Sequence, residues 1–201
     1  MRKNITIIFL FLTTIAFSQK LKVENDEIEI QYHWTREIVK NSIWTSVKLN
    51  SDNSKSLKNI YVKLKMTSTN KKEKEFEINK FILIDDKNKL KIRPNNISYQ
   101  VVAQVYPFQK LSTDKDINVE KYKLQYNSEV KDYFKEYEFS GYETLEIPIN
   151  YNTKENPELH ITYFKPLPFK KKKISLFYAV PSNINNATLY YGNEKIANLK
   201  F

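Results

Sequence analysis

Alternation of apolar and polar side chains across residues 60–93 is the feature that most constrains how this chain can fold. Aliphatic residues occupy every second position from Ile60 to Met66, so a strand here buries one face and exposes the other. Polar turn residues follow at 70–72, an apolar segment spans 75–84, and another polar turn spans 85–88. This stretch predicts a β-meander with one face toward water.

The rest of the chain repeats this pattern in short segments and predicts a mainly β protein. Further strands are expected at 20–23, 27–32, 42–49, 97–106, 144–149, 159–164, 174–180, 187–191 and 195–201. No internal repeat or long linker divides these segments, so residues 19–201 are expected to form a single antiparallel β-sandwich. Only two glycines occur, Gly141 and Gly192, so Asn and Asp are expected to take most left-handed turn positions.

Residues 107–168 differ in character and are expected to be an insertion that carries one α-helix, at about 128–139. The apolar side chains of this helix fall at helical spacing: Val130, Tyr133, Phe134 and Tyr137. Asn127 or Ser128 can cap its start, and Gly141 lies where a C-terminal cap is expected. Exposed tyrosines can stack on sugars or contact a protein partner. The helical spacing of Tyr133, Phe134 and Tyr137 instead favours packing of these side chains on one sheet.

The first 18 residues have the features of a signal peptide. A basic start, Arg2-Lys3, precedes an apolar run over 5–17 that is short of the ~20 residues that span a bilayer. Small residues at Ala16 and Ser18 predict cleavage after Ser18 and export to the periplasm or surface of a bacterium. A retained membrane anchor is the alternative. The chain has no cysteine, which excludes a lipoprotein signal and disulfides.

Basic residues outnumber acidic ones, and they are densest at Lys170, Lys171, Lys172 and Lys173. The formal charge is +10, and loss of the leader would remove two positive charges. Such a surface attracts polyanions, although codon usage in an AT-rich genome and solubility also explain the charge. We hypothesise that the lysine run binds a polyanion, with Phe164 and Phe169 as aromatic contacts. The alternative is a solvated loop that discourages edge-to-edge aggregation.

Motifs for common chemistries are missing from the sequence. Cysteine nucleophiles are excluded, and the two histidines, His33 and His160, lie near no Gly-x-Ser-x-Gly elbow. The spacing in Asp85-Asp86-Lys87-Asn88 does not match a calcium loop and favours a hairpin turn. No glycine-rich loop could cradle a phosphate. We therefore predict no catalytic residues, no metal site and no cofactor.

Two blocks of sequence carry a resemblance to a known family. The first runs from Tyr61 through Thr67 and Asn70-Lys71-Lys72 into Phe76 and Phe81–Asp86, and the second comprises Ile174–Pro181 and Ala187–Tyr190. In this order they resemble the bacterial, exported, telokin-like immunoglobulin-fold domains of unknown function. The resemblance implies an immunoglobulin-like sandwich and offers no catalytic residue. The chain departs from that family by lacking Gly in the turn at 86–88 and by its insertion.

The function predicted from sequence is a non-enzymatic binding or structural module of a bacterial envelope, with an envelope protein as its partner. The alternative is a module that binds an acidic glycan, another polyanion or an anionic lipid surface, without specific binding of nucleic acid. A carboxylate-based hydrolase of envelope polymers is the third possibility. A deep pocket lined by two carboxylates would favour the enzyme, and a flat aromatic strip beside the lysine run would favour the glycan binder.

Overall fold

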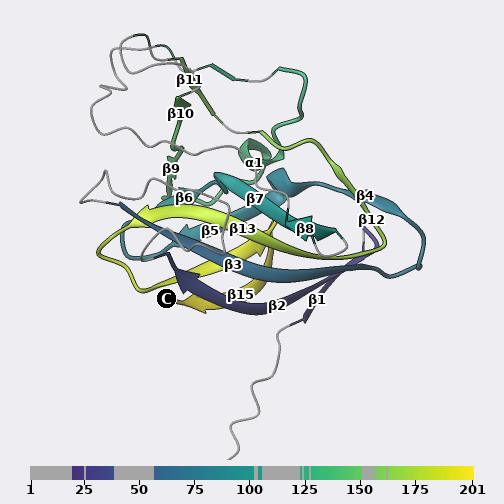
Figure 1. The fold of residues 1–201 in the computed structure, drawn as a ribbon. Coiled ribbons are helices and arrows are strands. Elements are labelled where there is room, and N and C mark those ends of the chain that lie inside the picture. The colour runs from purple at the N-terminus through teal and green to yellow at the C-terminus, as the bar shows by residue number, and fades with distance from the viewer. Residues whose placement is uncertain are drawn as a thin grey trace, which may run out of the picture.

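The computed structural model describes residues 20–24, 26–38, 57–101, 104–105, 123, 125–126, 128–150, 156, 158–161 and 163–201. Within these ranges strands predominate, and they form two sheets that enclose one large apolar cluster in a β-sandwich-like arrangement (Figure 1). Three predictions lie outside the described residues: the leader at 1–18, its cleavage after Ser18, and the strand at 42–49. Most of the first part of the insertion, 107–122, also lies outside them.

The larger sheet has six antiparallel strands in the order β1-β2-β3-β13-β7-β8. Their bounds are β1 Lys20–Val23, β2 Ile28–Glu37, β3 Leu57–Ser68, β13 Lys171–Pro181, β7 Asn96–Val101 and β8 Gln104–Val105. Strands β3 and β13 are the longest, and they pair from Lys171 opposite Thr67 to Pro181 opposite Leu57. They form the centre of the sheet.

The second sheet has five strands in the order β15-β14-β5-β6-β9. Their bounds are β15 Glu194–Lys200, β14 Asn186–Tyr191, β5 Phe81–Asp85, β6 Leu90–Ile92 and β9 Glu143–Leu145. All neighbours are antiparallel except β9, which comes from the insertion and pairs parallel with β6. Two small sheets pair β10 Ile149–Asn150 with β11 Leu159–His160, and β12 Leu167–Phe169 with β4 Lys74–Phe76.

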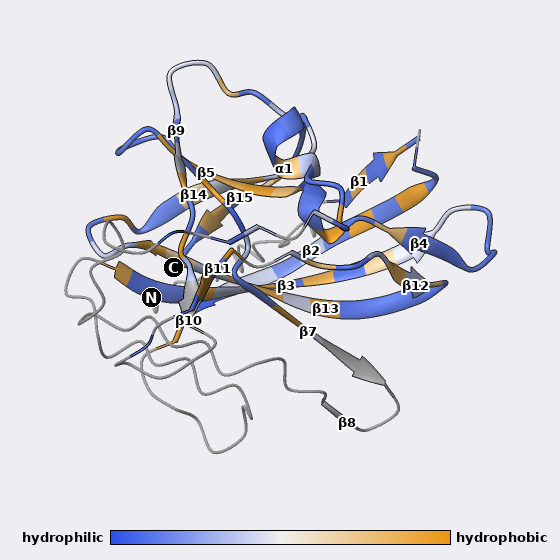
Figure 2. Ribbon diagram, turned by 90° about the horizontal axis from the view of Figure 1, so that it is seen from above, coloured by the Kyte–Doolittle hydropathy of each residue, from blue (hydrophilic) through white to orange (hydrophobic). Residues whose placement is uncertain are grey.

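Alternation along β3, together with the inward-facing side chains of the mostly apolar β13, produces the core between the sheets (Figure 2). The inward side chains are fully buried: Ile60, Val62, Leu64 and Met66 on β3, and Ile174, Leu176, Tyr178 and Val180 on β13. Strand β5 is buried on both faces, because Phe81 and Leu83 join this core while Ile82 and Ile84 face the insertion. The predictions of a mainly β protein with antiparallel sheets are therefore confirmed.

The predicted meander over 60–93 is wrong in its first half. Strand β3 pairs with β2 and β13, and it has no pairing with the segment at 75–84. That segment consists of β4, the short 3-10 helix η2 at Ile78–Lys80 and β5. Phe76 and Ile78 are both buried in the core, so η2 turns the chain from one layer to the other. The second half is correct, since β5 and β6 form a hairpin.

Asn and Asp shape the turns differently from our expectation. Among the described residues other than glycine, Glu27, Lys71 and Lys89 have positive φ, so the predicted use of Asn and Asp there is wrong. Instead, the Oδ1 atoms of Asn70 and Asp85 each accept the amide two residues further on, at 3.0 Å. Their side chains thus organise the turns without adopting the left-handed conformation themselves.

The predicted helix over 128–139 is reduced to a single turn, α1, at Tyr133–Glu136. Its N-cap, Asp132, makes no side-chain capping bond, because this carboxylate binds Arg93 instead. Packing of the stripe on a sheet is confirmed for Phe134, which is fully buried against Ile82 and Ile84 on the outer face of the five-stranded sheet. None of the described helical segments has the length and apolar character needed to cross a membrane.

The buried hydroxyl of the core residue Tyr178 gives a stability prediction. Tyr178 is fully buried, and its hydroxyl makes no hydrogen bond in the described part of the chain. A buried unsatisfied polar group costs about 1–3 kcal/mol. We expect Tyr178→Phe to raise the free energy of unfolding in urea by about 1 kcal/mol, and Tyr190→Phe, at a half-buried site, to change it little. A clear loss in Tyr178→Phe would contradict this assignment.

Candidate functional site

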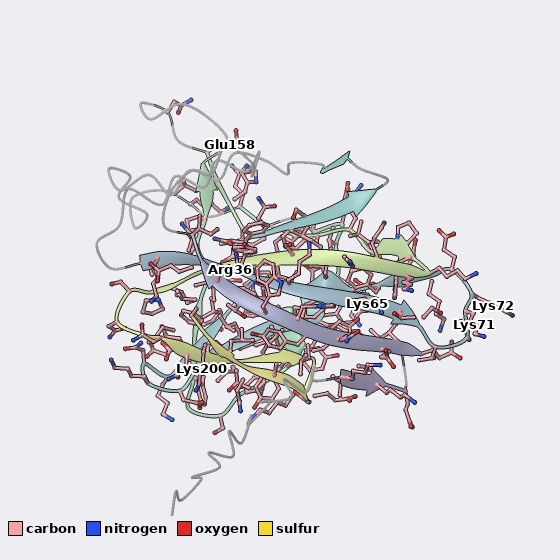
Figure 3. The ribbon with its side chains drawn as sticks, turned by 60° about the horizontal axis from the view of Figure 1, so that its bottom comes forward. Arg36, Lys65, Lys71, Lys72, Glu158 and Lys200 are labelled. Atoms are coloured by element: carbon pink, nitrogen blue, oxygen red, sulfur yellow. The ribbon has the colours of Figure 1, made fainter. Side chains whose placement is uncertain are left out.

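The outer face of the six-stranded sheet carries a group of basic side chains. The aliphatic side chains of β3 point into the core, so Lys63 and Lys65, which alternate with them, point outward. On β13, Lys171 and Lys173 point outward on the same side of the sheet. The register places Lys65 directly opposite Lys173, and Lys63 opposite Ser175. Arg36 of β2 lies on the same side of the sheet as Lys65 (Figure 3). We call these four lysines with Arg36 the basic face.

Positive charge on the basic face is not compensated by nearby carboxylates. In the described ranges none of its four lysines forms an ion pair, and Lys63 Nζ donates to Ser175 Oγ at 3.3 Å. Glu29 of β2 lies on this face, opposite Thr67 of β3. Its Oε1 atom pairs with Lys20 Nζ of β1 at 3.5 Å. Partial burial and then the charge of Lys173 lower the pKa of Lys63. Like charges directly opposite one another destabilise a sheet, so this arrangement opposes folding.

A row of aromatic rings crosses the same face from strand to strand. The ring of Trp34 on β2 meets Tyr61 on β3 edge-on, with centroids 4.9 Å apart. Tyr61 stacks with Phe177 on β13 at 6.0 Å. Trp34 and Tyr61 are half-buried and Phe177 is buried, and the planes of the Trp34 and Tyr61 rings are 82° apart. The guanidinium of Arg36 lies 4.8 Å from the centre of the Trp34 ring, which holds this cation in place.

A β-bulge adds His33 to the edge of the basic face. The register of β2 against β3 shifts between Tyr32 and Trp34, and His33 is the extra residue. The bulge interrupts the alternation of β2, which extends to Glu37 beyond the strand predicted at 27–32. His33 is exposed, and its pKa is lowered first by desolvation and then by the charges of Lys173, Lys65 and Lys63. The ring is therefore within electrostatic reach of three lysines.

The predicted lysine run is divided by strand alternation. Lys171 and Lys173 join the basic face, whereas Lys172 has the opposite orientation and its Nζ donates to the carbonyl of Pro168 at 3.2 Å. Lys170 is exposed at the bend before β13. The basic residues of β2 and β3 were missed, because their proximity to the run depends on the pairing of strands more than 100 residues apart. In the sequence, the lysines of β3 were visible as the polar positions of the alternating pattern over 60–67.

The two predicted aromatic contacts are not on the surface. Phe169 is buried and its ring lies 4.8 Å from that of Phe76. Phe164 is also buried, and its backbone is held by Asn79, whose amide donates to the Phe164 carbonyl at 2.8 Å. The prediction of surface contacts at Phe164 and Phe169 is therefore wrong. In an apolar sandwich, rings beside β4 and β12 gain more from burial than from exposure.

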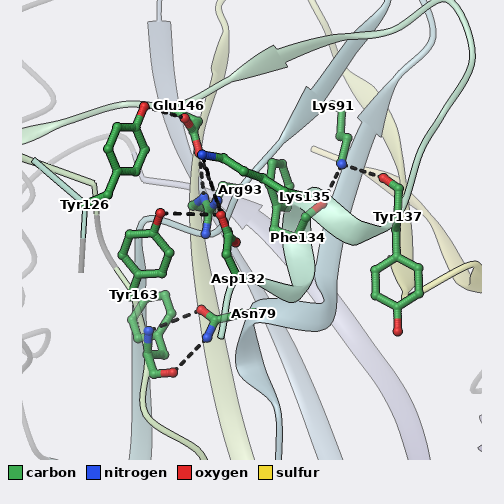
Figure 4. A network of polar contacts seen from close by, with 11 residues as sticks. Asn79, Lys91, Arg93, Tyr126, Asp132, Phe134, Lys135, Tyr137, Glu146 and Tyr163 are labelled. Carbon is green, nitrogen blue, oxygen red and sulfur yellow. Dashed lines mark hydrogen bonds and ion pairs between the residues drawn. The ribbon is translucent and has the colours of Figure 1, made fainter. Parts of the chain in front are cut away.

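A second polar cluster surrounds the buried guanidinium of Arg93, where the insertion contacts the five-stranded sheet (Figure 4). Its Nη2 donates to both oxygens of Asp132, at 2.9 and 3.0 Å, and to Glu146 Oε1 at 2.8 Å. Tyr163 donates to Asp132 at 3.4 Å and Tyr126 to Glu146 at 3.3 Å. Burial, and then the charge of Asp132, raises the pKa of Tyr163. Two carboxylates thus converge, but both are engaged by one cation.

Lys91 fastens the helical turn beside this cluster. Its Nζ donates to the carbonyls of Phe134 and Tyr137, each at 2.5 Å, and so satisfies the C-terminal end of α1. Burial, followed by the charge of Arg93, lowers the pKa of Lys91. The Phe134 ring lies 4.3 Å from Lys91 Nζ and 4.4 Å from the Arg93 guanidinium. The cluster connects the insertion to the five-stranded sheet, and its bonds are structural.

Comparison of the chain with protein-family models, curated proteins and solved structures found no match. The resemblance to telokin-like domains therefore stays a prediction. Among the described residues, no group of three or more His, Asp or Glu side chains is placed to hold a metal ion. The two features available for a functional argument are the basic face and the Arg93 cluster.

Proposed function

We propose that this chain is a non-enzymatic binding module whose ligand is an acidic polysaccharide, bound along the basic face. The observation that carries the proposal is the adjacency of Lys63, Lys65, Lys171 and Lys173 on two paired strands without a carboxylate partner in the described ranges. Cations placed together against their mutual repulsion are stabilised when a polyanion neutralises them. Each lysine near an anionic surface contributes about 1 kcal/mol.

The arrangement of the lysines along two paired strands favours an extended polymer. Aromatic rings supply large contact area at low cost in conformational entropy, and Trp34 and Tyr61 lie beside the lysines in this way. An anionic membrane is a poorer fit, because Trp34 and Tyr61 are half-buried and the described residues of the face include no exposed large apolar side chain that could insert into lipid. Of the large hydrophobic side chains described, the exposed one is Tyr126, which belongs to the Arg93 cluster. A protein partner would favour an exposed apolar patch, and Tyr126 alone does not make one.

An enzyme has less support than a binding module. A glycosidase needs two carboxyl groups that face a substrate with separate roles. Asp132 and Glu146 instead share the guanidinium of Arg93, and their side chains are 18% and 13% exposed. We further propose an immunoglobulin-like arrangement for the sandwich and export to a bacterial envelope through the leader at 1–18.

Alternation within the lysine run supplies a matched test of this proposal. Lys171→Ser with Lys173→Ser removes two charges from the basic face, and Lys170→Ser with Lys172→Ser removes the same charge beside it. Using heparin as the probe and uncharged dextran as the control, we expect the first pair to weaken binding about 10- to 30-fold. The second pair should change binding less than about threefold. Fluorescence anisotropy with labelled heparin measures both.

Three results would contradict the proposal. Equal losses in the two double variants would show that net charge, and not the face, attracts the polymer. Absence of heparin binding by the unmodified chain would remove the proposed function. Binding to vesicles containing anionic lipid, without binding to soluble heparin, would assign the face to a membrane instead.

A further inference from the structure

His33 occupies an unusual position for one of only two histidines in the chain. The bulge in β2 places His33 immediately before Trp34, whose partner on β3 is Lys63. It is exposed, so a polymer lying on the basic face can reach its ring. Bulges in antiparallel sheets re-aim a side chain, and they are over-represented beside functional sites.

The charges that act on His33 come from two strands other than its own. Lys63 and Lys65 face it from β3, and Lys173 faces it from β13. All three are positive, and they disfavour the imidazolium in the ligand-free protein. An acidic polymer bound to these lysines would cancel their repulsion and place its own negative charge near the ring. Both effects favour the protonated form.

We propose that His33 is a binding residue of the basic face and takes up a proton when an acidic polysaccharide binds there. This inference rests on the proposed function, because the polymer supplies the negative charge. By linkage, a ligand that raises the pKa of a group binds more tightly as the pH falls through that pKa. Affinity therefore increases from pH 7.5 to pH 5.5. One titrating group changes affinity by at most about tenfold per pH unit.

The chain contains its own control for this experiment. His160 lies in β11, and its Nε2 is 2.8 Å from Glu158 Oε1, away from the basic face. Heparin affinity is measured at pH 5.5, 6.5 and 7.5, at constant ionic strength, for the unmodified chain, His33→Gln and His160→Gln. The sulfates of heparin stay ionised across this range, so the protein supplies the pH dependence. We expect several-fold tightening at pH 5.5 in the unmodified chain and His160→Gln, and almost none in His33→Gln.

Two direct readouts accompany the affinities. Calorimetry at pH 6.5 in buffers of different ionisation enthalpy should show proton uptake on heparin binding, which disappears in His33→Gln. NMR of the imidazole protons in the unmodified chain should show a higher pKa for His33 with heparin than without. With only two histidines, His160→Gln assigns the signals. The NMR measurement does not depend on the folding of the His33 variant.

The outcomes separate this inference from the proposed function. Heparin binding without pH dependence, or with equal pH dependence in His33→Gln, would overturn the role of His33 and leave the polymer site intact. A His33 pKa that is unchanged by bound heparin would do the same. Absence of heparin binding at pH 5.5 and at pH 7.5 would remove the proposed function, and the role of His33 with it.

Discussion

Arg93→Ala is expected to lower the free energy of unfolding by about 3–5 kcal/mol, the usual cost of removing one partner from a buried ion pair. The guanidinium is 4% exposed and satisfies Asp132 and Glu146 together. Its loss leaves the largely buried Glu146 without an ion-pair partner in the described ranges and leaves Asp132 with the exposed Lys135, at 3.8 Å. It also removes the ring contacts with Phe134 and Tyr163. Urea denaturation followed by circular dichroism measures the change as a shift in the transition midpoint.

Arg36→Ala is the matched control for this loss. Arg36 is the same residue type but is exposed, and its contact with Trp34 is worth about 0.5–1 kcal/mol. A loss in Arg93→Ala no larger than that in Arg36→Ala would show that the cluster is not a stabilising connection.

A variant with serine at all four lysines of the basic face is expected to lose at least tenfold, and up to about 10³-fold, in heparin affinity. The upper figure assumes about 1 kcal/mol for each of Lys63, Lys65, Lys171 and Lys173. Heparin binding by the unmodified chain should weaken steeply with salt, because exposed charges are screened, and the variant should show a flatter dependence. Anisotropy titrations between low and physiological salt measure both effects.

The matched control replaces four exposed lysines elsewhere with serine: Lys20, Lys22, Lys195 and Lys200. It carries the same net charge as the basic-face variant, so a comparable loss of affinity would contradict a defined site. Stability provides a second distinction. Removing Lys65 and Lys173 relieves a like-charge pair, so the basic-face variant should be as stable as the unmodified chain or more so, by a few tenths of a kcal/mol. A marked destabilisation would show that the lysines serve folding.

Strand identity in this protein follows from local pattern. The alternation at 60–66 placed β3 correctly, because a half-buried strand requires side chains of opposite character on its two faces. The apolar run at 174–180 before Pro181 placed β13, and the segments at 187–191 and 195–201 placed β14 and β15. The prediction of a helix over 128–139 was too long for a related reason. Its apolar stripe correctly placed Phe134 in a buried cluster, but helical spacing does not reveal that the capping carboxylate of Asp132 is used by Arg93.

Which residues come together was decided by tertiary structure. Arg93 lies 39 residues from Asp132 and 53 from Glu146, and charged residues at such separations show no periodicity. The lysine run was visible in the sequence, yet the partners that make it a face, Lys63 and Lys65, come from a strand more than 100 residues away. Sequence alternation determined which side of β3 faces water, because the spacing of apolar side chains is a property of neighbours in the chain. Strand pairing decided which outward side chains lie together, because sheet register is set by packing across the whole core.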